Sequence, residues 1–560
     1  MKKIFAIIGL VLGTITALAQ ETAAPKWADK AGKAIIEVKT FDSEGKELST
    51  GTGFFIGNGT AVADYKLFKG ASAAEITDAG GKQGKVTCIM GADDTYSLVK
   101  FSVDMKKNTA VTTAQNQASI GATLYILGYS RNKKATCPSG TVSEVTAVDD
   151  ACPYYTLSGT IDDKYVGAPL FNADGELVGT LQPSVGGTAY ALGAKFIDNL
   201  KIDAISSKAA AMALSSIGIQ KGLPESMEES LVYLYFKSKN ADNDEYMNLL
   251  NQFINRYPDN SEGYYRRATP LIDLQRFDEA DSDLQTYLKL SSDKAQANAR
   301  IGETIHNKLV YQPTPEYAPW TYDVALSHID KALETDARNE YKLLKAKILM
   351  SKENYKEALA IYDEFNTGAD RSPATLYAAC LAHDALGDSL SIQVELLDSA
   401  ISMMGTPTPA DAAPYVLRRG QVKTVMGRYK DAVIDYNQYL YLNNNKVNSK
   451  FYYDRSQLEV NAKMYQQALD DINTAIDKAP GEALYYVEKS ALLLRVGELD
   501  ECIDAAEKCV QINPDLYDAY RIMGYAQIQK GDKTNGIKNI NKAIELGDES
   551  AKQLLETYGK

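Results

Sequence analysis

The chain has 560 residues, too many for a single hydrophobic core, so its length predicts at least two domains. With 45% hydrophobic and 24% charged residues it has a globular composition, which excludes a largely disordered, collagen-like or multi-span membrane protein. Its 73 acidic residues outnumber its 60 basic ones, which argues against nucleic acid as the main partner because phosphate binding needs concentrated lysine and arginine.

The first residues predict an export signal. Two lysines precede an apolar run from Ile4 to Ala17, and Ala17-Leu18-Ala19 offers a small-x-small cleavage site. The run is too short to span a bilayer, and no cysteine follows the cleavage site. We therefore expect a signal peptide over residues 1–19, cleavage near Ala19, and a periplasmic or secreted protein without a membrane span.

Residues 33–196 are rich in short segments of strand-like composition. AIIEVKTF, KVTCIM, ATLYILGY and similar segments recur about every ten residues, and Gly, Asn and Asp separate them. The stretch Asn172-Ala173-Asp174-Gly175 is typical of a hairpin turn. Many short, evenly spaced strands predict an all-β domain, either a closed barrel or a sandwich, and we place it at residues 30–205.

Two of the six cysteines lie close together in this β-rich region. Cys137 and Cys152 flank what reads as two strands joined by a polar turn at Asp149 and Asp150. In an exported protein, cysteines opposed on neighbouring strands favour a disulfide, which would stabilise the fold by about 3 kcal/mol. We predict this pair, and the alternative is two separate buried thiols.

Helical patterns replace the strands after residue 218, and they repeat. Small or packing-competent residues recur along this part of the chain, and most steps between them are 34 residues: Leu234, Ala268, Gly302, Ala346, Cys380, Gly420, Ser456, Ser490 and Gly524. Because 34 residues is the period of a helix–turn–helix repeat, residues 225–547 resemble tetratricopeptide repeats. We expect a linker at residues 206–225 and an array of about nine helical hairpins at residues 226–558.

The resemblance to tetratricopeptide repeats implies how this array binds. Such hairpins stack into a superhelix whose concave face, lined by the first helix of each unit, takes extended peptides or helices. Counting from the small residues gives the candidate peptide-binding residues Tyr265, Gln421, Tyr453, Gln457 and Tyr525. One insertion in the array, rich in proline and containing Trp320, is either a binding element or a packed surface loop.

Three segments of the β-rich region carry a second resemblance. They are GTGFFIGNGTAVADYKLFKGA (51–71), DDTYSLVKFSV (93–103) and DKYVGAPLFNADGELVGT (163–180). Their order and spacing resemble the trypsin-like serine protease family, in its bacterial exported branch. The resemblance implies a double β-barrel, so the expected fold class is an all-β double barrel followed by an all-α solenoid.

The catalytic positions of that family fall on residues without the matching chemistry. The general base falls on Lys66, the orienting acid on Thr95 and the nucleophile on Val166. A protonated lysine does not accept a proton at neutral pH, and valine has no group that attacks a carbonyl. The three histidines all lie beyond residue 300, so no shifted alignment restores a histidine-based triad. A Ser–Lys dyad of Lys66 with Ser158 or Ser97 stays open, although the spacing does not support it.

These observations favour protein binding over catalysis. We expect a non-enzymatic scaffold or adaptor for other exported or envelope proteins. The alternatives are a serine-type peptidase or regulator of proteolysis with an atypical site, and a structural component of a surface complex. We predict no metal and no cofactor, and we interpret the acidic pair Asp470-Asp471 as part of a solvated helix face.

Overall fold

The computed structural model describes residues 24–558, except residues 58, 106, 132–136, 149–151 and 160. The predicted signal peptide and its cleavage site lie outside the described residues. The chain forms two compact units, Met1–Ser292 and Asp293–Lys560. Because this division falls inside the expected repeat array, the domain boundaries drawn from the sequence stay a prediction.

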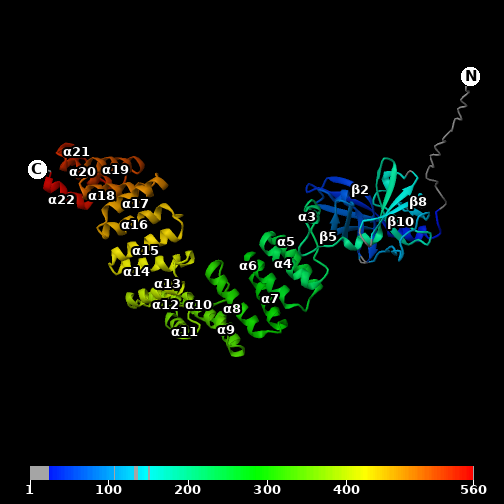
Figure 1. Ribbon diagram of the computed structural model, residues 1–560, viewed down its shortest axis with the longest axis horizontal. Coiled ribbons are helices and arrows are strands. Elements are labelled where there is room, and N and C mark those ends of the chain that lie inside the picture. Colours follow the sequence, from blue (N-terminus) through cyan, green and yellow to red (C-terminus); the bar gives the residue numbers. More distant parts are fainter. Residues whose placement is uncertain are drawn as a thin grey trace, which may run out of the picture. The chain divides into compact units, whose positions relative to one another are not determined.

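The first unit begins with two closed antiparallel barrels of six strands each (Figure 1). The strands of the first barrel are β1 (Ile35–Phe41), β2 (Glu47–Gly57), β3 (Thr60–Asp64), β4 (Ala73–Asp78), β5 (Gln83–Asp93) and β6 (Leu98–Val103). Those of the second are β7 (Thr123–Ile126), β8 (Ser139–Ala147), β9 (Pro153–Ser158), β10 (Pro169–Phe171), β11 (Leu177–Val185) and β12 (Thr188–Gly193). Both barrels have the same connectivity, because the orders β1-β2-β3-β6-β5-β4 and β7-β8-β9-β12-β11-β10 are equivalent.

Short helical turns join or flank these strands. They are α1 (Ala28–Ala31), η1 (Gly32–Ala34), α2 (Tyr65–Phe68), η2 (Asp163–Tyr165) and η3 (Ala194–Asn199), followed by α3 (Lys208–Ser215).

Three hydrophobic clusters hold the barrels together. One fills the first barrel and one the second, and the third joins them, with Phe54 and Leu98 from the first barrel packed with Phe171 and Leu192 from the second. Buried and half-buried side chains alternate along β1, as expected for a strand with one face toward the interior of a barrel.

The segment expected to be a linker packs against the first barrel. Residues 216–223, which we call the strap, run beside β5: the Ile89 N–H donates to Gln220 O, and the Gly222 N–H donates to Ile89 O, both at 2.8 Å. The Tyr65 hydroxyl lies 2.6 Å from the Ser216 hydroxyl. Because apolar residues of α3 and the strap also join the core of the first barrel, this segment is part of the fold rather than a free connection.

Helices make up the rest of the described chain. Those of the first unit are α4 (Met227–Asn240), α5 (Asn243–Arg256), α6 (Ser261–Asp273) and α7 (Phe277–Leu290). Those of the second are α8 (Lys294–Tyr311), α9 (Tyr322–Thr335), α10 (Asn339–Ser351), α11 (Tyr355–Thr367), α12 (Pro373–Leu386), α13 (Leu390–Met403), η4 (Ala410–Ala412), α14 (Ala413–Val425), α15 (Tyr429–Leu442), α16 (Ser449–Asn461), α17 (Tyr465–Lys478), α18 (Ala483–Val496), α19 (Leu499–Ile512), α20 (Tyr517–Gln529), α21 (Lys533–Glu545) and α22 (Glu549–Tyr558).

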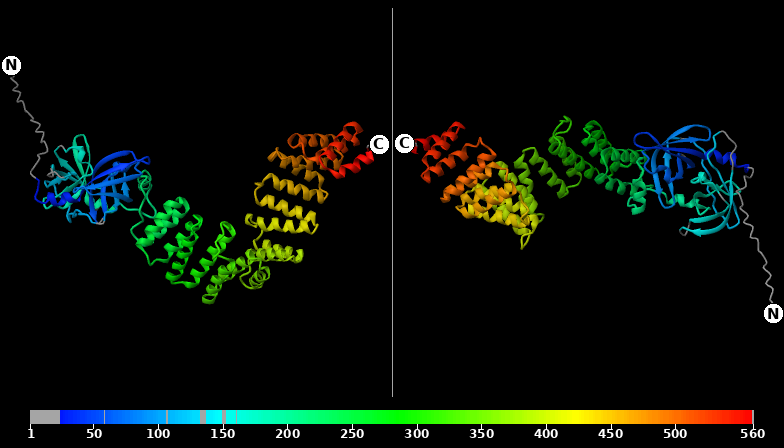
Figure 2. Two further views of the ribbon diagram at one scale, coloured as in Figure 1. Left: turned by 180° about the vertical axis from the view of Figure 1, so that it is seen from behind. Right: turned by 90° about the horizontal axis from the view of Figure 1, so that it is seen from above.

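Consecutive helices pair into hairpins. Within the residues that the structure describes, the eighteen helices from α4 to α21 form nine hairpins, and α22 packs on the last one. Figure 2 shows the later hairpins of the second unit, yellow to red, stacked in chain order. The expected fold class, a double β-barrel followed by a helical repeat region, is confirmed. No described helix is both long and apolar enough to cross a membrane.

The structure does not join Cys137 and Cys152, which are both buried, so the predicted disulfide between them is wrong. The strand register gives the reason. The Val148 N–H donates to Cys152 O at the turn between β8 and β9, whereas Cys137 precedes β8 at its other end. The nine residues of β8 span roughly 30 Å, so the two cysteines flank opposite ends of one hairpin.

The proline-rich insertion is a packed loop. The Trp320 side chain is 3% exposed and meets the Tyr317 ring edge-on at 5.3 Å. The buried Lys308 ammonium donates to Pro315 O at 2.7 Å, which ties the loop to α8.

Candidate functional site

The three family catalytic positions converge on one buried carboxylate. Lys66 lies on α2 two residues after Asp64, and Thr95 lies two residues before Ser97. The Ser97 hydroxyl donates to Asp64 Oδ1 at 2.5 Å. Val166 precedes Gly167, where an added Cβ would lie 3.0 Å from the Asp64 Cβ. The structure therefore brings the surroundings of Lys66, Thr95 and Val166 together at the contact between the two barrels.

Local backbone conformation fixes this arrangement. Asp64 ends β3 and caps α2, because its carboxylate accepts from the Lys66 N–H at 3.0 Å. Gly167 has φ +81°, a conformation that glycine adopts without strain, and the lack of a side chain allows its close approach to Asp64. Ser97 takes the left-handed region at φ +50°, a strained choice that aims its hydroxyl at Asp64.

The side chains at this point differ in how far they are exposed. Asp64 is 8% exposed and Ser97 6% exposed, so both are closed off from a substrate. Lys66 and Thr95 are exposed, and Val166 is half-buried and offers only methyl groups. The Ser97 hydroxyl donates to the buried Asp64 carboxylate, which also caps α2.

The structure places the five predicted peptide-binding residues on first helices of their hairpins. Tyr265 on α6 belongs to the first unit, and its ring lies 4.9 Å from that of Tyr287. The others lie in the second unit. Gln421 on α14 is exposed, and Gln457 on α16 is half-buried.

Neighbouring side chains cover part of the ring in two of these predicted residues. The Tyr453 ring stacks on Tyr485 of α18 at 5.2 Å, and burial, followed by the nearby Glu488, raises the Tyr453 pKa to about 12. The Tyr525 hydroxyl accepts from Gln529, and its ring lies 5.8 Å from Tyr558 of α22. These tyrosines therefore pack between helices and present only part of each ring.

Sequence reasoning missed a repeated buried ion pair inside the hairpins. An arginine on the first helix holds an aspartate on the second, sixteen residues later, in three hairpins: Arg267–Asp283, Arg419–Asp435 and Arg455–Asp471, with closest distances of 2.7, 2.6 and 2.5 Å. Each arginine also donates at 2.7 Å to the preceding hairpin, through Asn251, Asp398 or Asn437. An arginine directly before the small residue of the repeat, with an aspartate sixteen residues on, is the signal that finds them.

One of these pairs corrects the reading of Asp470-Asp471. Asp470 is exposed, but Asp471 is 6% exposed and binds Arg455 through both carboxylate oxygens. Glu459 lies beside the same pair, and burial, with the Asp471 charge, raises its pKa to about 8 while Arg455 partly opposes the shift. Asp470 is therefore solvated, whereas Asp471 is a buried partner of Arg455 that links the two helices.

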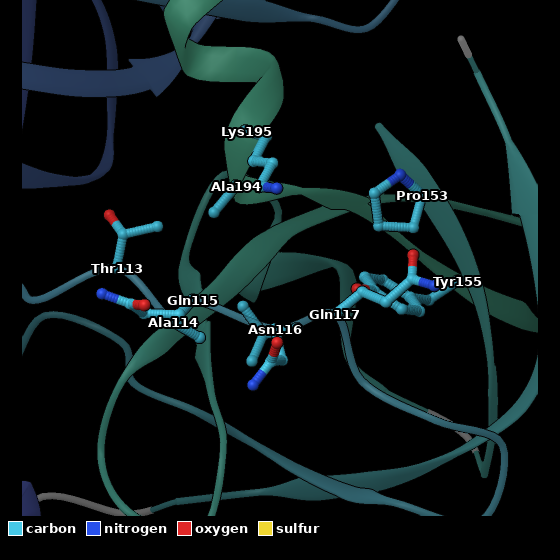
Figure 3. Close-up of a pocket in the computed structure, with 10 residues that line it drawn as sticks. Thr113, Ala114, Gln115, Asn116, Gln117, Pro153, Tyr155, Ala194 and Lys195 are labelled. Carbon is cyan, nitrogen blue, oxygen red and sulfur yellow. The ribbon is translucent and has the colours of Figure 1, made fainter. Parts of the chain in front are cut away.

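The second barrel has a cavity of its own, away from Asp64 (Figure 3). It measures about 380 Å³, and Lys195, Thr113, Gln115, Asn116 and Tyr155 are among its lining residues. The Tyr155 hydroxyl accepts from the Ala118 N–H at 3.2 Å, and burial raises the pKa of Tyr155, which keeps the phenol protonated. Amides and one lysine make this cavity suited to a small polar ligand.

Comparisons with known proteins agree with both halves of the fold. Residues 51–179 match the family model for the trypsin-like peptidase domain, and residues 483–516 match that for the tetratricopeptide repeat. The chain thus carries a trypsin-like domain near its N-terminus and tetratricopeptide repeats in its helical part, as the sequence predicted.

Two curated relatives show how far the similarity extends. The anti-sigma-I factor RsgI9 of Acetivibrio thermocellus is 27% identical over 150 residues, which are 26% of this chain and 21% of that protein. Tetratricopeptide repeat protein 33 of Mus musculus is 32% identical over 84 residues, 15% of this chain and 32% of that protein. The chain spans only about a fifth to a third of the length of these relatives.

Two proteases are among the solved structures that part of the chain resembles. The Rv3671c protease from M. tuberculosis in its active form gives a TM-score of 0.28 with 17% identity, over 40% of this chain and 96% of that one. The serine endoprotease from Yersinia pestis gives a TM-score of 0.28 with 17% identity, over 32% of this chain and 66% of that one.

Proposed function

We propose that this protein is an exported, non-catalytic scaffold or adaptor that binds other exported or envelope proteins through its tetratricopeptide repeats. The observation that carries the proposal is the set of side chains gathered around Asp64. Lys66 and Val166 stand at the base and nucleophile positions, and the buried Ser97 hydroxyl is engaged with Asp64. None of these groups activates a nucleophile at neutral pH.

The histidine content supports the same reading. The three histidines of the sequence, His306, His328 and His383, lie in the second unit, so the trypsin-like domain has no imidazole to serve as base. The glycine that approaches Asp64 serves the contact between the barrels, a role that a folded domain without activity still needs.

The repeats support a binding role. A helical array that is ordered before its partner arrives loses little conformational entropy on binding, and the concave face of such arrays takes extended segments. Gln421 and Gln457 with the partly exposed rings of Tyr453 and Tyr525 supply hydrogen bonds and rigid contact area there.

Two measurements test the proposal. Fluorophosphonate labelling of the purified full-length protein should give no labelled serine, with trypsin as the positive control. Stoichiometric labelling, at Ser97 above all, would instead make the protein a serine-type peptidase with an atypical site.

The second measurement is recovery of a partner from envelope extract. The variant Tyr453→Ala with Gln457→Ala should lose that partner, whereas Tyr441→Ala with Gln467→Ala, exposed residues on second helices, should keep it. Circular dichroism of each variant checks that loss of the Tyr453–Tyr485 stack has not unfolded the hairpin. A partner retained by the first variant would move the binding site away from this face.

A further inference from the structure

A polar cleft lies inside the first unit, between the first barrel and α5. It measures about 550 Å³, and β3, β5, β6, the strap and α5 line it. It is separate from the residues around Asp64 and from the predicted concave-face residues, none of which line it.

The helical wall of the cleft is a stripe of carboxamides. Asn248, Asn251, Gln252 and Asn255 follow each other at spacings that place them on one face of α5. The apolar residues between them are buried on the opposite face, among them Leu250. Because the remaining lining residue of α5 is Arg256, this wall is almost free of charge in a chain with 24% charged residues.

The barrel wall offers hydroxyl groups and a distorted strand. Thr60 of β3 and Cys88 of β5 are both paired with Ser102 of β6, so the three side chains form a row across the strands. The register of β5 shifts twice, next to Thr87 and Met90. Such β-bulges leave backbone groups outside the ladder and re-aim side chains, here into the cleft.

Fixed hydrogen bonds hold the centre of the stripe. Asn251 Oδ1 accepts from Arg267 Nη1 at 2.7 Å, and Gln252 Nε2 donates to Lys221 O at 3.5 Å. At the two ends, Asn248 and Asn255 are exposed, and among the described residues neither carboxamide has a hydrogen-bond partner. The cleft therefore combines a rigid centre with two open carboxamides at a fixed separation.

We propose that this cleft binds the main chain of an extended, uncharged polypeptide segment. A carboxamide offers one acceptor and two donors, which match the C=O and N–H groups of a peptide unit. Asn248 and Asn255 are separated by about 10 Å along the helix axis, the length of roughly three extended residues. The half-buried Met90 gives apolar side chains of the segment a surface to contact.

The lining favours a peptide over a carbohydrate. No aromatic side chain lines the cleft within the described residues, so the apolar face of a sugar ring would lack a ring to stack on. The single charged side chain, Arg256, donates to Pro224 O at 2.6 Å, one residue beyond the strap. A basic segment therefore finds no carboxylate there, and an acidic segment finds only this one guanidinium.

The test uses the full-length protein and a fluorescein-labelled, capped peptide of repeating Gly-Ala-Ser, followed by fluorescence anisotropy. The unlabelled peptide should displace the probe, whereas the same peptide with N-methylated backbone amides should not. The variant Asn248→Leu with Asn255→Leu should weaken binding at least tenfold, because it removes the hydrogen bonds of two carboxamides. The matched control Asn240→Leu with Gln285→Leu, exposed carboxamides outside the cleft, should bind like the parent.

Each contrary result overturns the proposal in a distinct way. No binding by the parent protein, or equal displacement by the N-methylated peptide, excludes main-chain recognition. Displacement by maltohexaose would make the cleft a carbohydrate site. Binding that survives the cleft variant but is lost in Tyr453→Ala with Gln457→Ala would place the peptide on the concave face, which supports the proposed function and removes this second site. Thermal unfolding of every variant confirms that the first unit remains folded.

Discussion

The trypsin-like domain and the repeat array each bury aspartates, but they satisfy them differently. In the domain, Asp64 accepts from the Ser97 hydroxyl and from a backbone N–H, and no cation touches it among the described residues. In the array, Asp471 binds the Arg455 guanidinium through both oxygens. The comparison shows that a buried carboxylate serves as a local cap where neutral donors meet it, and as a cross-helix clamp where a guanidinium does.

The two arrangements also differ in how often they occur in the chain. Asp64 depends on a single junction of β3, α2 and Ser97, contributed by distant parts of the chain. The arginine–aspartate clamp recurs in three hairpins at one fixed spacing, because each hairpin repeats the same geometry.

The largest expected effect comes from breaking a clamp on one side. Arg455→Leu leaves Asp471 buried without its cation and should lower the local free energy of opening by about 4 kcal/mol. Hydrogen exchange of α16 and α17 in the full-length protein measures this opening. Removing both partners, Arg455→Leu with Asp471→Leu, should restore most of the loss. The control Arg428→Leu breaks an exposed pair with Asp431 and should cost less than about 0.5 kcal/mol. A similar loss in Arg455→Leu and Arg428→Leu would contradict the view that the buried pair stabilises its hairpin more than an exposed pair does.

The second-largest expected effect is on the pH dependence of stability, through Glu459 beside the Arg455–Asp471 pair. The pKa of Glu459 is raised in the folded state from the usual 4.5 to about 8, so the native protein holds this proton more tightly than the unfolded chain. Its contribution to stability is complete below about pH 4.5 and is lost as the pH rises through about 8.

Replacing Glu459 tests this dependence. Glu459→Gln should flatten the decline and stabilise α16 and α17 on the order of 3 kcal/mol above pH 8, as measured by hydrogen exchange across a pH series. Unchanged pH dependence in the variant would show that other groups cause it.

The smallest effect concerns the cap in the trypsin-like domain. Ser97→Ala removes one donor from the buried Asp64 but leaves the Lys66 N–H in place, so we expect a loss of about 2 kcal/mol, seen as faster exchange in β3 and β6. Ser158→Ala, at an exposed hydroxyl of the same domain, should change exchange little. A loss in Ser97→Ala as large as that in Arg455→Leu would mean that the two buried aspartates are equally critical, against the comparison.

Much of this molecule was accessible to sequence reasoning. Short strand-like segments separated by Gly-rich turns predicted an all-β domain, and the 34-residue period predicted the hairpins, because both depend on local spacing along the chain. The resemblance to trypsin-like proteases implied the double barrel. The resemblance to trypsin-like proteases assigned Lys66, Thr95 and Val166 to the catalytic positions, and residues beside each of them meet at Asp64.

Other features depended on which segments meet. Local spacing suggested that Cys137 and Cys152 face each other, but the register of β8 and β9 puts them at opposite ends of the hairpin. From the sequence we interpreted the pair Asp470-Asp471 as solvated. The interpretation is wrong for Asp471, because the packing of α16 on α17 buries it against Arg455.

The sequence by itself determined the all-β region, the 34-residue helical repeat and the chemistry of the side chains at the family catalytic positions. All three are carried by local spacing and residue identity. Only the tertiary structure decided which polar groups face each other: the strap against β5, the carboxamides of α5 against the hydroxyls of the barrel, and the clamp across each hairpin. The physical reason is that burial and hydrogen bonding are properties of pairs, and the partners of Asp471 and Asn248 lie on other elements that the periodicity of one element does not identify.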